Sequence, residues 1–317
     1  MKTNSNNQRT FIIPAEYSNE RLDQCLAKLL PEYSRTQIQA WIEAGLILID
    51  DHIVKPKTKV KGGEHVLTHI TPRIMPAWEA QALPLTIVYE DEALIIINKP
   101  VGMIVHPGAG HSDQTLLNAL LHHAPTLKLL PRAGILHRLD KNTSGLLVIA
   151  KTAAALKHLL HQLKERTLLR EYQAIVTGRL ISGGKVDAPI GRHALQRIRM
   201  AVTETGKPAC THYRVMERYR AHTRLTLRLE TGRTHQIRVH MAHIHHPIVG
   251  DTTYGGRLQL TKGMSSDLIT CLRQFKHQAL HAFRLGLVHP VTEKWLQWEI
   301  ELPEDMQQLI HFLKEDV

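Results

Sequence analysis

The stretch HRLDKNTSG (residues 137–145), which runs directly into the apolar residues LLVIA (146–150), decides how this sequence is interpreted. It places the carboxylate of Asp140 and the guanidinium of Arg138 on a polar loop that leads into a strand pattern. Folding alone does not favour charge in such a place, because burying an unpaired charge is costly. An aspartate before a Ser-Gly turn often just hydrogen-bonds the turn backbone, but a second polar cluster of similar character follows at 231–240. We therefore take Asp140 as the first candidate for chemistry.

The second cluster, TGRTHQIRVH (231–240), is polar at a place where a strand pattern resumes. A buried catalytic carboxylate needs a partner that keeps it ionised and oriented, and an arginine that binds both oxygens does this best. Arg233 and Arg238 are the candidates. Histidines gather here too, at positions 235, 240, 243, 245 and 246. No two histidines of this cluster have HxxxH or HExxH spacing and no cysteine is near in the sequence, so we expect no catalytic metal. Backbone orientation or phosphate contacts suit these histidines better.

The positive charge of the chain is local. The 317 residues carry a formal charge of +11, and the segment from Lys128 to Arg220 alone holds 18 basic and 6 acidic residues. A basic field around the Asp140 loop suits a polyanionic substrate, although a solvated basic face is the alternative. Aromatic residues make up 5% of the chain, so broad stacking platforms are not the main mode of binding.

Three widely spaced cysteines, Cys25, Cys210 and Cys271, form no CxxC pair. They argue for a reducing compartment and against a disulfide framework or a structural zinc site. The N-terminal residues MKTNSNNQRTFIIP lack the apolar core of a signal peptide, and no run approaches the roughly 20 apolar residues of a membrane span. We expect a cytoplasmic protein with no membrane partner.

The first part of the chain predicts a small domain at residues 16–76, preceded by a flexible arm at 1–15. The predicted elements are a strand at 10–13, helices at 19–30 and 34–44, and strands at 46–49 and 65–70. The second helix is announced by a capping box, Ser34 with Gln37. Lys55, Lys57, Lys59 and Lys61 alternate between the two later strands and would project to one side of an extended segment. Prolines between Thr71 and Pro84 mark a linker, placed at 77–86.

The remaining residues, 87–317, predict a second domain of class α+β. Its expected elements are strands at 87–90, 93–98, 146–150, 170–176, 199–203, 209–217, 222–229, 279–288 and 295–302, and helices at 115–123, 152–164 and 303–313. Strands joined by hairpin-length turns favour a largely antiparallel mixed sheet flanked by helices. The glycine-rich loop at 106–110 has neither Walker A nor dinucleotide spacing, so no nucleotide cofactor is implied.

Four motifs occur in order along the chain. They are HRLDKNTSGLLVIAKT (137–152), REYQAIVTG (170–178), TGRTHQIRVHMAHIHHPIVGDTTYGG (231–256) and QALHAFRLGLVHPVT (278–292). Their order and spacing resemble the RluA-like pseudouridine synthases, and the resemblance runs from about Ile12 to the C-terminus. Two helices followed by strands with a basic edge likewise resemble the S4 RNA-binding module that precedes the catalytic domain in many of these synthases.

The resemblance implies a monomeric enzyme that isomerises uridine to pseudouridine in 23S rRNA of the large ribosomal subunit or its precursor, with no cofactor. It makes Asp140 the catalytic aspartate, Arg238 its partner with Arg233 as runner-up, and Tyr172 the residue that stacks on the target base and acts in proton abstraction. The implied target is the intersubunit stem-loop, helix 69, with several uridines modified. Attack on C1′ and removal of the 2′ proton both remain open as mechanisms.

The expected RNA contacts lie in three groups. They are His137, Arg138 and Thr143 on the Asp140 loop, Arg233 and His235 in the second cluster, and Arg21, Ser34, Arg35, Lys55, Lys57, Lys59 and Lys61 in the S4-like domain. A lysine edge that merely discourages sheet pairing is the alternative for the last four. Three other functions compete: an RNA-binding ribosome-assembly factor, a histidine-metal hydrolase, and a synthase of the same family for another rRNA or tRNA site. The presence of Asp140, Tyr172 and Arg238 together counts against the first.

Overall fold

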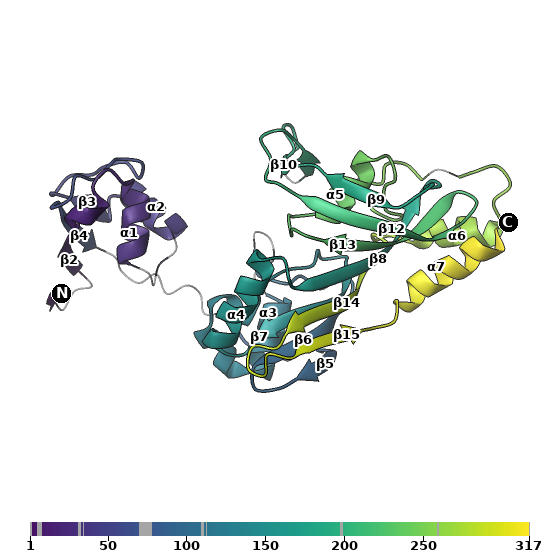
Figure 1. Cartoon of the computed structure of the whole chain (residues 1–317), viewed down its shortest axis with the longest axis horizontal. Coiled ribbons are helices and arrows are strands. Elements are labelled where there is room, and N and C mark those ends of the chain that lie inside the picture. Colours follow the sequence, from purple (N-terminus) through teal and green to yellow (C-terminus); the bar gives the residue numbers. More distant parts are fainter. Residues whose placement is uncertain are drawn as a thin grey trace. The chain divides into compact units, whose positions relative to one another are not determined.

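The computed structural model describes residues 2–4, 8–30, 33, 35–69, 78–108, 111, 113–196, 199–258 and 260–316. The chain folds into two compact units, residues 1–77 and 78–317 (Figure 1). Across the described residues, no helix has both the length and the apolar character needed to cross a membrane.

The first unit packs two helices against a small antiparallel sheet. In sheet order its strands are β1 Lys2–Asn4, β2 Gln8–Ile12, β4 His65–His69 and β3 Ile47–Ile49, and its helices are η1 Ala15–Tyr17, α1 Leu22–Leu29 and α2 Arg35–Glu43. Leu22 and Leu26 of α1 are buried four residues apart, as are Ile38 and Ile42 of α2. The helical spacing that predicts both helices is therefore the spacing that builds this core.

Two expectations for this unit differ from the structure. Strand β2 covers residues 8–12 and pairs along its length with β4, so the strand expected at 10–13 is present but begins earlier, within the part expected to be flexible. The lysine segment is not regularly extended, because the Thr58 amide donates to the Lys55 carbonyl at 2.9 Å and closes a turn. All four lysines are nevertheless exposed. Ser34, the expected cap of α2, lies outside the described residues.

The segment predicted as a linker belongs to the second unit from residue 78 onward. The Asn118 amide nitrogen donates to the Glu79 carbonyl at 2.8 Å, and the Gln81 backbone amide donates to the Asn118 carbonyl at 3.0 Å. A polar segment with prolines and no strand pattern resembles a linker in sequence, yet here Asn118 of helix α3 (Leu116–His123) binds two of its backbone groups.

The second unit is built on a nine-stranded mixed sheet. In sheet order its strands are β5 Ile87–Glu90, β6 Leu94–Lys99, β7 Ser144–Ala150, β14 Leu280–Val288, β8 Leu169–Thr177, β13 His222–Leu229, β12 Cys210–Arg218 and β9 Gly184–Asp187, with β15 Trp295–Glu299 paired to β14. The pairing of β14 with β7 is parallel, and the other pairs of this sheet are antiparallel. The predicted α+β class with a largely antiparallel sheet is confirmed.

Helices cover this sheet on both faces (Figure 1). The remaining elements are α3 Leu116–His123, η2 Pro125–Leu129, η3 Pro131–Gly134, α4 Ala153–Lys164, α5 Gln236–His243, α6 Ser266–Gln274, α7 Glu304–Glu315 and the hairpin β10 Ile190–Arg192 with β11 Met200–Val202. Every residue of β7 is buried: Leu147 packs on the α3 side, and Val148 packs on the α4 side. Strands covered on both faces read as continuous apolar runs, which explains the LLVIA pattern.

Gly145, at the start of β7, makes a close approach possible. Its φ is +116°, and a Cβ there would lie 2.3 Å from the carbonyl oxygen of Ala282 on β14. Any side chain would push β14 away from the end of the Asp140 loop. The absence of a side chain at Gly145 thus lets β14 pack closely against β7 at the end of the Asp140 loop.

The segment 231–240 does not resume a strand, as its pattern suggested. Residues 236–243 form helix α5 instead, and Gln236 to Met241 are all buried. Ile237 and Val239 mimic strand alternation, but a helix buried on all sides leaves no 3.6-residue period to detect. The sequence interpretation also assigned no element to residues 266–274, which form α6.

Candidate active site

Asp140 lies on a loop held from both sides. Leu139 before it is buried, and β7 begins at Ser144. The Thr143 amide donates to the Asp140 carbonyl at 3.1 Å, which closes the turn. The carboxylate itself is 17% exposed, so it faces a small opening to solvent. The turn that might have explained this aspartate uses its carbonyl and leaves its side chain free to point at other groups.

Arg238 of α5 reaches the carboxylate of Asp140. Its Nη1 donates to Asp140 Oδ2 at 3.0 Å, so the predicted pair is in contact. The bidentate partner of Arg238 is a different residue, Asp251: Nε donates to Oδ2 at 2.7 Å and Nη2 to Oδ1 at 2.9 Å. Asp251 was not among the site residues expected from the sequence. The fork of Arg238 is fixed by Asp251, and the remaining nitrogen is aimed at Asp140.

The environment favours the charged forms of Arg238 and Asp251. Burial opposes ionisation of Asp251, but the hydrogen bonds and charge of Arg238, with the amides of Thr253 and Tyr254, lower the pKa of its carboxyl below the ordinary value. Burial likewise opposes the charge on Arg238, yet Asp251 and then Asp140 raise the pKa of its guanidinium. A buried cation between two carboxylates thus gives Asp140 an oriented positive neighbour.

His235 and Tyr254 form a second layer beside Asp140 and Arg238. His235 precedes α5 with a left-handed backbone, φ 57°, and its Nδ1 is 2.8 Å from the Tyr254 hydroxyl. Its Nε2 lies 3.9 Å from Asp140 Oδ1. Burial lowers the pKa of His235, with Asp140 opposing. The Tyr254 ring lies under the Arg238 guanidinium at 5.0 Å, and Tyr254 was also missed by the sequence analysis.

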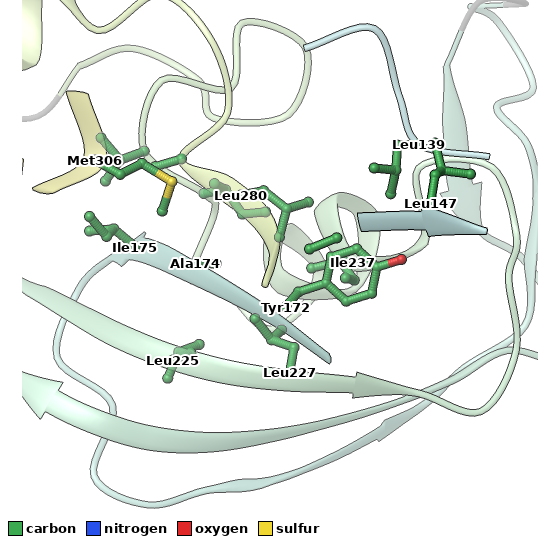
Figure 2. Packing of buried hydrophobic residues seen from close by; sticks show 14 of the residues in the cluster. Leu139, Leu147, Tyr172, Ala174, Ile175, Leu225, Leu227, Ile237, Leu280 and Met306 are labelled. Atoms are coloured by element: carbon green, nitrogen blue, oxygen red, sulfur yellow. The ribbon is translucent and has the colours of Figure 1, made fainter. Parts of the chain in front are cut away.

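Tyr172 of β8 lines the same pocket as Asp140 and Arg238. Its ring is 5% exposed and lies in a cluster with Leu139, Ile237 and Leu280 (Figure 2). Burial raises the pKa of its hydroxyl, Arg170 lowers it and Asp140 raises it. The phenol is therefore neutral at pH 7. The pocket thus combines the Asp140 carboxylate, the Tyr172 ring and apolar walls with several basic side chains.

The other predicted residues near the loop divide into two kinds. Arg138, Arg233 and His235 line the pocket, and Arg138 is exposed. Thr143 and His137 have internal partners instead: Thr143 Oγ1 accepts from Gln278 Nε2 at 2.9 Å, and His137 Nε2 accepts from the Val148 amide at 3.3 Å. Burial, then the charge of Arg170, lowers the pKa of His137 to about 3. These two contacts support the loop from within.

Lys99 is a buried cation that the sequence analysis did not single out. Its Nζ donates to the carbonyls of Pro100 at 2.7 Å, Met103 at 3.0 Å and Lys141 at 3.1 Å. Burial lowers the pKa of Lys99 to about 7, with the charge of Asp140 opposing. The side chain connects the end of β6 to the residue after Asp140, so it supports the Asp140 loop from within the protein.

In the first unit, Arg21 and Arg35 meet at the buried Asp23. Arg21 Nη2 lies 2.9 Å and Arg35 Nη2 2.8 Å from Asp23 Oδ2. Burial opposes ionisation of Asp23, but hydrogen bonds from Arg21, Arg35 and Gln39 lower its pKa to about 2. Both arginines remain partly exposed, so each presents a fixed positive edge to solvent.

Histidine ring nitrogens near α5 are largely used by the protein itself. His240 Nδ1 is 2.9 Å from Thr211 Oγ1, and its Nε2 is 2.9 Å from the Ala188 carbonyl. His246 Nδ1 is 2.9 Å from the Thr177 carbonyl. Within the described residues, one group of three has metal-ligand spacing, Cys210, His212 and Glu230, and none of its members lines the Asp140 pocket.

Comparison with known proteins places these observations in a family. Residues 93–243 match the model described as RNA pseudouridylate synthase, and residues 20–66 match the S4 domain. The solved structure of human RNA Pseudouridylate Synthase Domain Containing 4 superimposes with a TM-score of 0.56 at 26% identity, covering 72% of this chain and 93% of that one.

The curated relatives are closer still. The chain is 52% identical to ribosomal large subunit pseudouridine synthase D of Haemophilus influenzae over 96% of this chain and 94% of that protein. It is 51% identical to the protein of that name from Escherichia coli over 98% and 95%, and 50% identical to that from Pseudomonas aeruginosa over 98% and 97%. The chain therefore belongs to the RNA pseudouridylate synthase family. Within that family it is similar, over nearly its whole length, to the D-type enzymes that carry an S4 domain.

Proposed function

We propose that this protein isomerises specific uridines of 23S rRNA to pseudouridine, with Asp140 as the catalytic carboxylate and without a cofactor. One observation carries the proposal: Asp140 opens into a pocket shared with Tyr172 while Arg238, clamped by Asp251, donates to it at 3.0 Å. A binding module needs no carboxylate held in a pocket by a buried arginine. The substrate follows from relatives that are named ribosomal large subunit pseudouridine synthase.

The reaction detaches uracil from C1′ of the ribose, turns it, and rejoins it through C5. An ionised carboxylate beside the ribose serves either path, attack on C1′ or removal of the 2′ proton. Arg238 contributes by orienting Asp140 through the hydrogen bond from Nη1. Apolar walls from Leu139, Ile237 and Leu280 exclude water from the detached base.

The target uridine must leave its stack to reach this pocket. Tyr172 offers a ring face for the base, and its neutral hydroxyl is available as a hydrogen-bond donor or, with a base to receive its proton, in proton transfer. Arg138, exposed on the Asp140 loop, is placed to fill the vacated space or to hold the RNA backbone.

RNA binding rests on positive charge in both units. Arg21 and Arg35 at Asp23, with the exposed Lys55, Lys57, Lys59 and Lys61, supply phosphate contacts in the S4 unit. Arg138 and Arg233 supply them at the pocket, and His235 is proposed to contact the RNA there through hydrogen bonding. The full RNA target proposed is the intersubunit stem-loop of 23S rRNA, helix 69, with several of its uridines modified.

The test is pseudouridine mapping of rRNA from cells that lack this protein and are complemented with wild type, Asp140→Asn or Asp267→Asn. Asp267 is an exposed aspartate on α6 and serves as the matched control. We expect specific 23S rRNA sites to vanish in the deletion and to return with wild type and Asp267→Asn but not with Asp140→Asn. Equal restoration by Asp140→Asn would replace the enzyme by an RNA-binding assembly factor. Loss of sites in tRNA or elsewhere in rRNA would give the same chemistry another substrate.

A further inference from the structure

A thiol, an imidazole and a carboxylate meet on one face of the nine-stranded sheet, at strands β12 and β13 and outside the Asp140 pocket. Cys210 opens β12, His212 lies two residues later on the same face, and Glu230 follows the end of β13. Cys210 Sγ is 3.7 Å from His212 Nε2 and 3.4 Å from Glu230 Oε1, and His212 Nε2 is 2.6 Å from Glu230 Oε1. Sulfur, imidazole nitrogen and carboxylate oxygen thus converge on one point.

These separations fit a tetrahedral metal ion. Zinc–ligand bonds of about 2.3 Å to sulfur and about 2.0–2.1 Å to nitrogen or oxygen place sulfur roughly 3.5 Å from each lighter ligand, and nitrogen roughly 3.3 Å from oxygen. The two distances from Cys210 Sγ already match. The His212–Glu230 distance is shorter because those atoms share a hydrogen bond, which the ion would replace. Three protein ligands leave one position for water.

The surroundings hold two of the ligands in place. The Cys210 amide donates to Thr231 Oγ1 at 3.1 Å, and its carbonyl accepts from Gln236 Nε2 at 2.9 Å. Arg166 Nη1 binds Glu230 Oε2 at 2.6 Å, which leaves Oε1 turned toward the sulfur. Such outer contacts orient metal ligands in known sites. His212 and Glu230 are partly exposed, so an ion has access from solvent.

The charges around the sulfur come from several strands. Asp187 of β9 is the register partner of Cys210 and pairs with Lys185 at 3.2 Å, while Arg166 neutralises part of Glu230. Burial, then Glu230, raises the pKa of the Cys210 thiol to about 11. A bound ion would take the sulfur as a thiolate, so the S–H proton leaves to solvent as the metal–sulfur bond forms.

We propose that Cys210, His212 and Glu230 bind a thiophilic divalent transition metal ion of the zinc class. The ion acts as a structural tether. It fastens the start of β12 to the residue before Thr231, and Thr231 with Gln236 fixes the beginning of α5, which carries Arg238. The Asp140 pocket contains none of the three ligands, so the chemistry there proceeds without the ion.

The test is direct binding of Co²⁺ to untagged, reduced, full-length protein that has been treated with a chelator and desalted. Co²⁺ reports its ligands, because a thiolate gives a charge-transfer band and tetrahedral geometry gives strong visible bands. The 22 histidines of the chain make weak binding elsewhere unavoidable, so the thiolate band is the primary readout. We expect one Co²⁺ per chain with this band, its displacement by Zn²⁺, and a rise in the unfolding temperature with Zn²⁺.

Three variants test the ligands, and two further variants serve as controls. Cys210→Ser should abolish the thiolate band, and His212→Asn and Glu230→Gln should each weaken Co²⁺ binding at least tenfold. Cys271→Ser and His243→Asn, matched changes at a cysteine and a histidine outside the cluster, should leave the band and the affinity unchanged. Circular dichroism checks the fold of each variant. Because Cys210 is buried, the partly exposed His212 and Glu230 keep the test valid if Cys210→Ser folds poorly.

Two results would overturn the proposal. One is a wild-type protein that takes up Co²⁺ without a thiolate band. The other is unchanged affinity in both His212→Asn and Glu230→Gln. Neither depends on pseudouridine formation, so this proposal and the proposed function fail independently.

Discussion

Replacing Asp251 by asparagine tests whether Asp251 is what fixes Arg238. The side chain of Asp251 is fully buried, and that of Arg238 is 8% exposed. Asparagine keeps the shape and one acceptor for the Thr253 and Tyr254 amides, but its NH₂ group faces a donor of Arg238. The charge is lost, and Asp140 remains as the carboxylate partner of Arg238.

The expected loss of folding free energy in Asp251→Asn follows from the burial of the Asp251–Arg238 ion pair. Removing one partner of a buried ion pair costs about 3–5 kcal/mol, and the lower end applies because Asp140 still compensates part of the charge. A loss of about 3 kcal/mol lowers the unfolding temperature of a unit of this size by roughly 6–12 °C. A misaimed Arg238 also leaves Asp140 unoriented, for which we expect a loss of roughly 100-fold in single-turnover rate, as for other outer contacts of a reactive group.

The direction in which the stability contribution of Asp251 changes with pH follows from its pKa. The pKa of Asp251 is lowered in the folded state, so its contribution to stability is present above the ordinary aspartate pKa of about 4 and is lost as pH falls through the folded value. Urea unfolding of wild type and Asp251→Asn at pH 7 and pH 3 should show a large difference that shrinks at pH 3. Asp267→Asn, the exposed control, should stay within about 0.5 kcal/mol. An Asp251→Asn variant as stable and as active as this control would refute the reasoning.

Three further predictions follow from the same contacts. The pKa of Lys99 is lowered to about 7 in the folded state, so between about pH 7 and 10 the folded protein binds fewer protons than the unfolded chain. The free energy of unfolding should therefore rise over that pH range in wild type, and rise less in Lys99→Met, as measured by urea unfolding at several pH values. Tyr172→Phe keeps the packed ring and should retain stability within about 1 kcal/mol while slowing single-turnover pseudouridine formation at least tenfold; an unchanged rate would remove the hydroxyl from the mechanism. Neutralising the four exposed lysines of the S4 unit should lower the slope of log affinity for RNA against log salt concentration by up to about 3–4. The rate at saturating RNA should not change. An unchanged slope would mean that these residues are only a solvated edge: Lys55, Lys57, Lys59 and Lys61.

Much of the fold can be predicted from local sequence patterns. The buried stripe of α1 and the alternating strands of the second unit follow from periodicity, because each element covers one face with apolar residues. The LLVIA run after the Asp140 loop marks a strand buried on both faces. Asp140, Tyr172 and Arg238 were named from their motifs, and the structure brings all three to one pocket.

Other features were decided by tertiary structure. Helix α5 is buried all round, so its period was hidden and it resembled a strand. Asp251, 13 residues after Arg238, takes the bidentate contact that the sequence analysis assigned to the catalytic carboxylate. The sequence pattern does not indicate whether Asp140 or Asp251 lies closer to Arg238.

The sequence by itself determined the α+β class, the S4 unit and the loop that carries the carboxylate, because periodicity and contiguous motifs are local properties. Tertiary structure decided which partner holds Arg238, that Lys99 supports the loop, and that Cys210 meets Glu230 across two strands. These contacts join residues far apart in the chain, and their energies depend on burial and direction, which exist only after the sheet has formed.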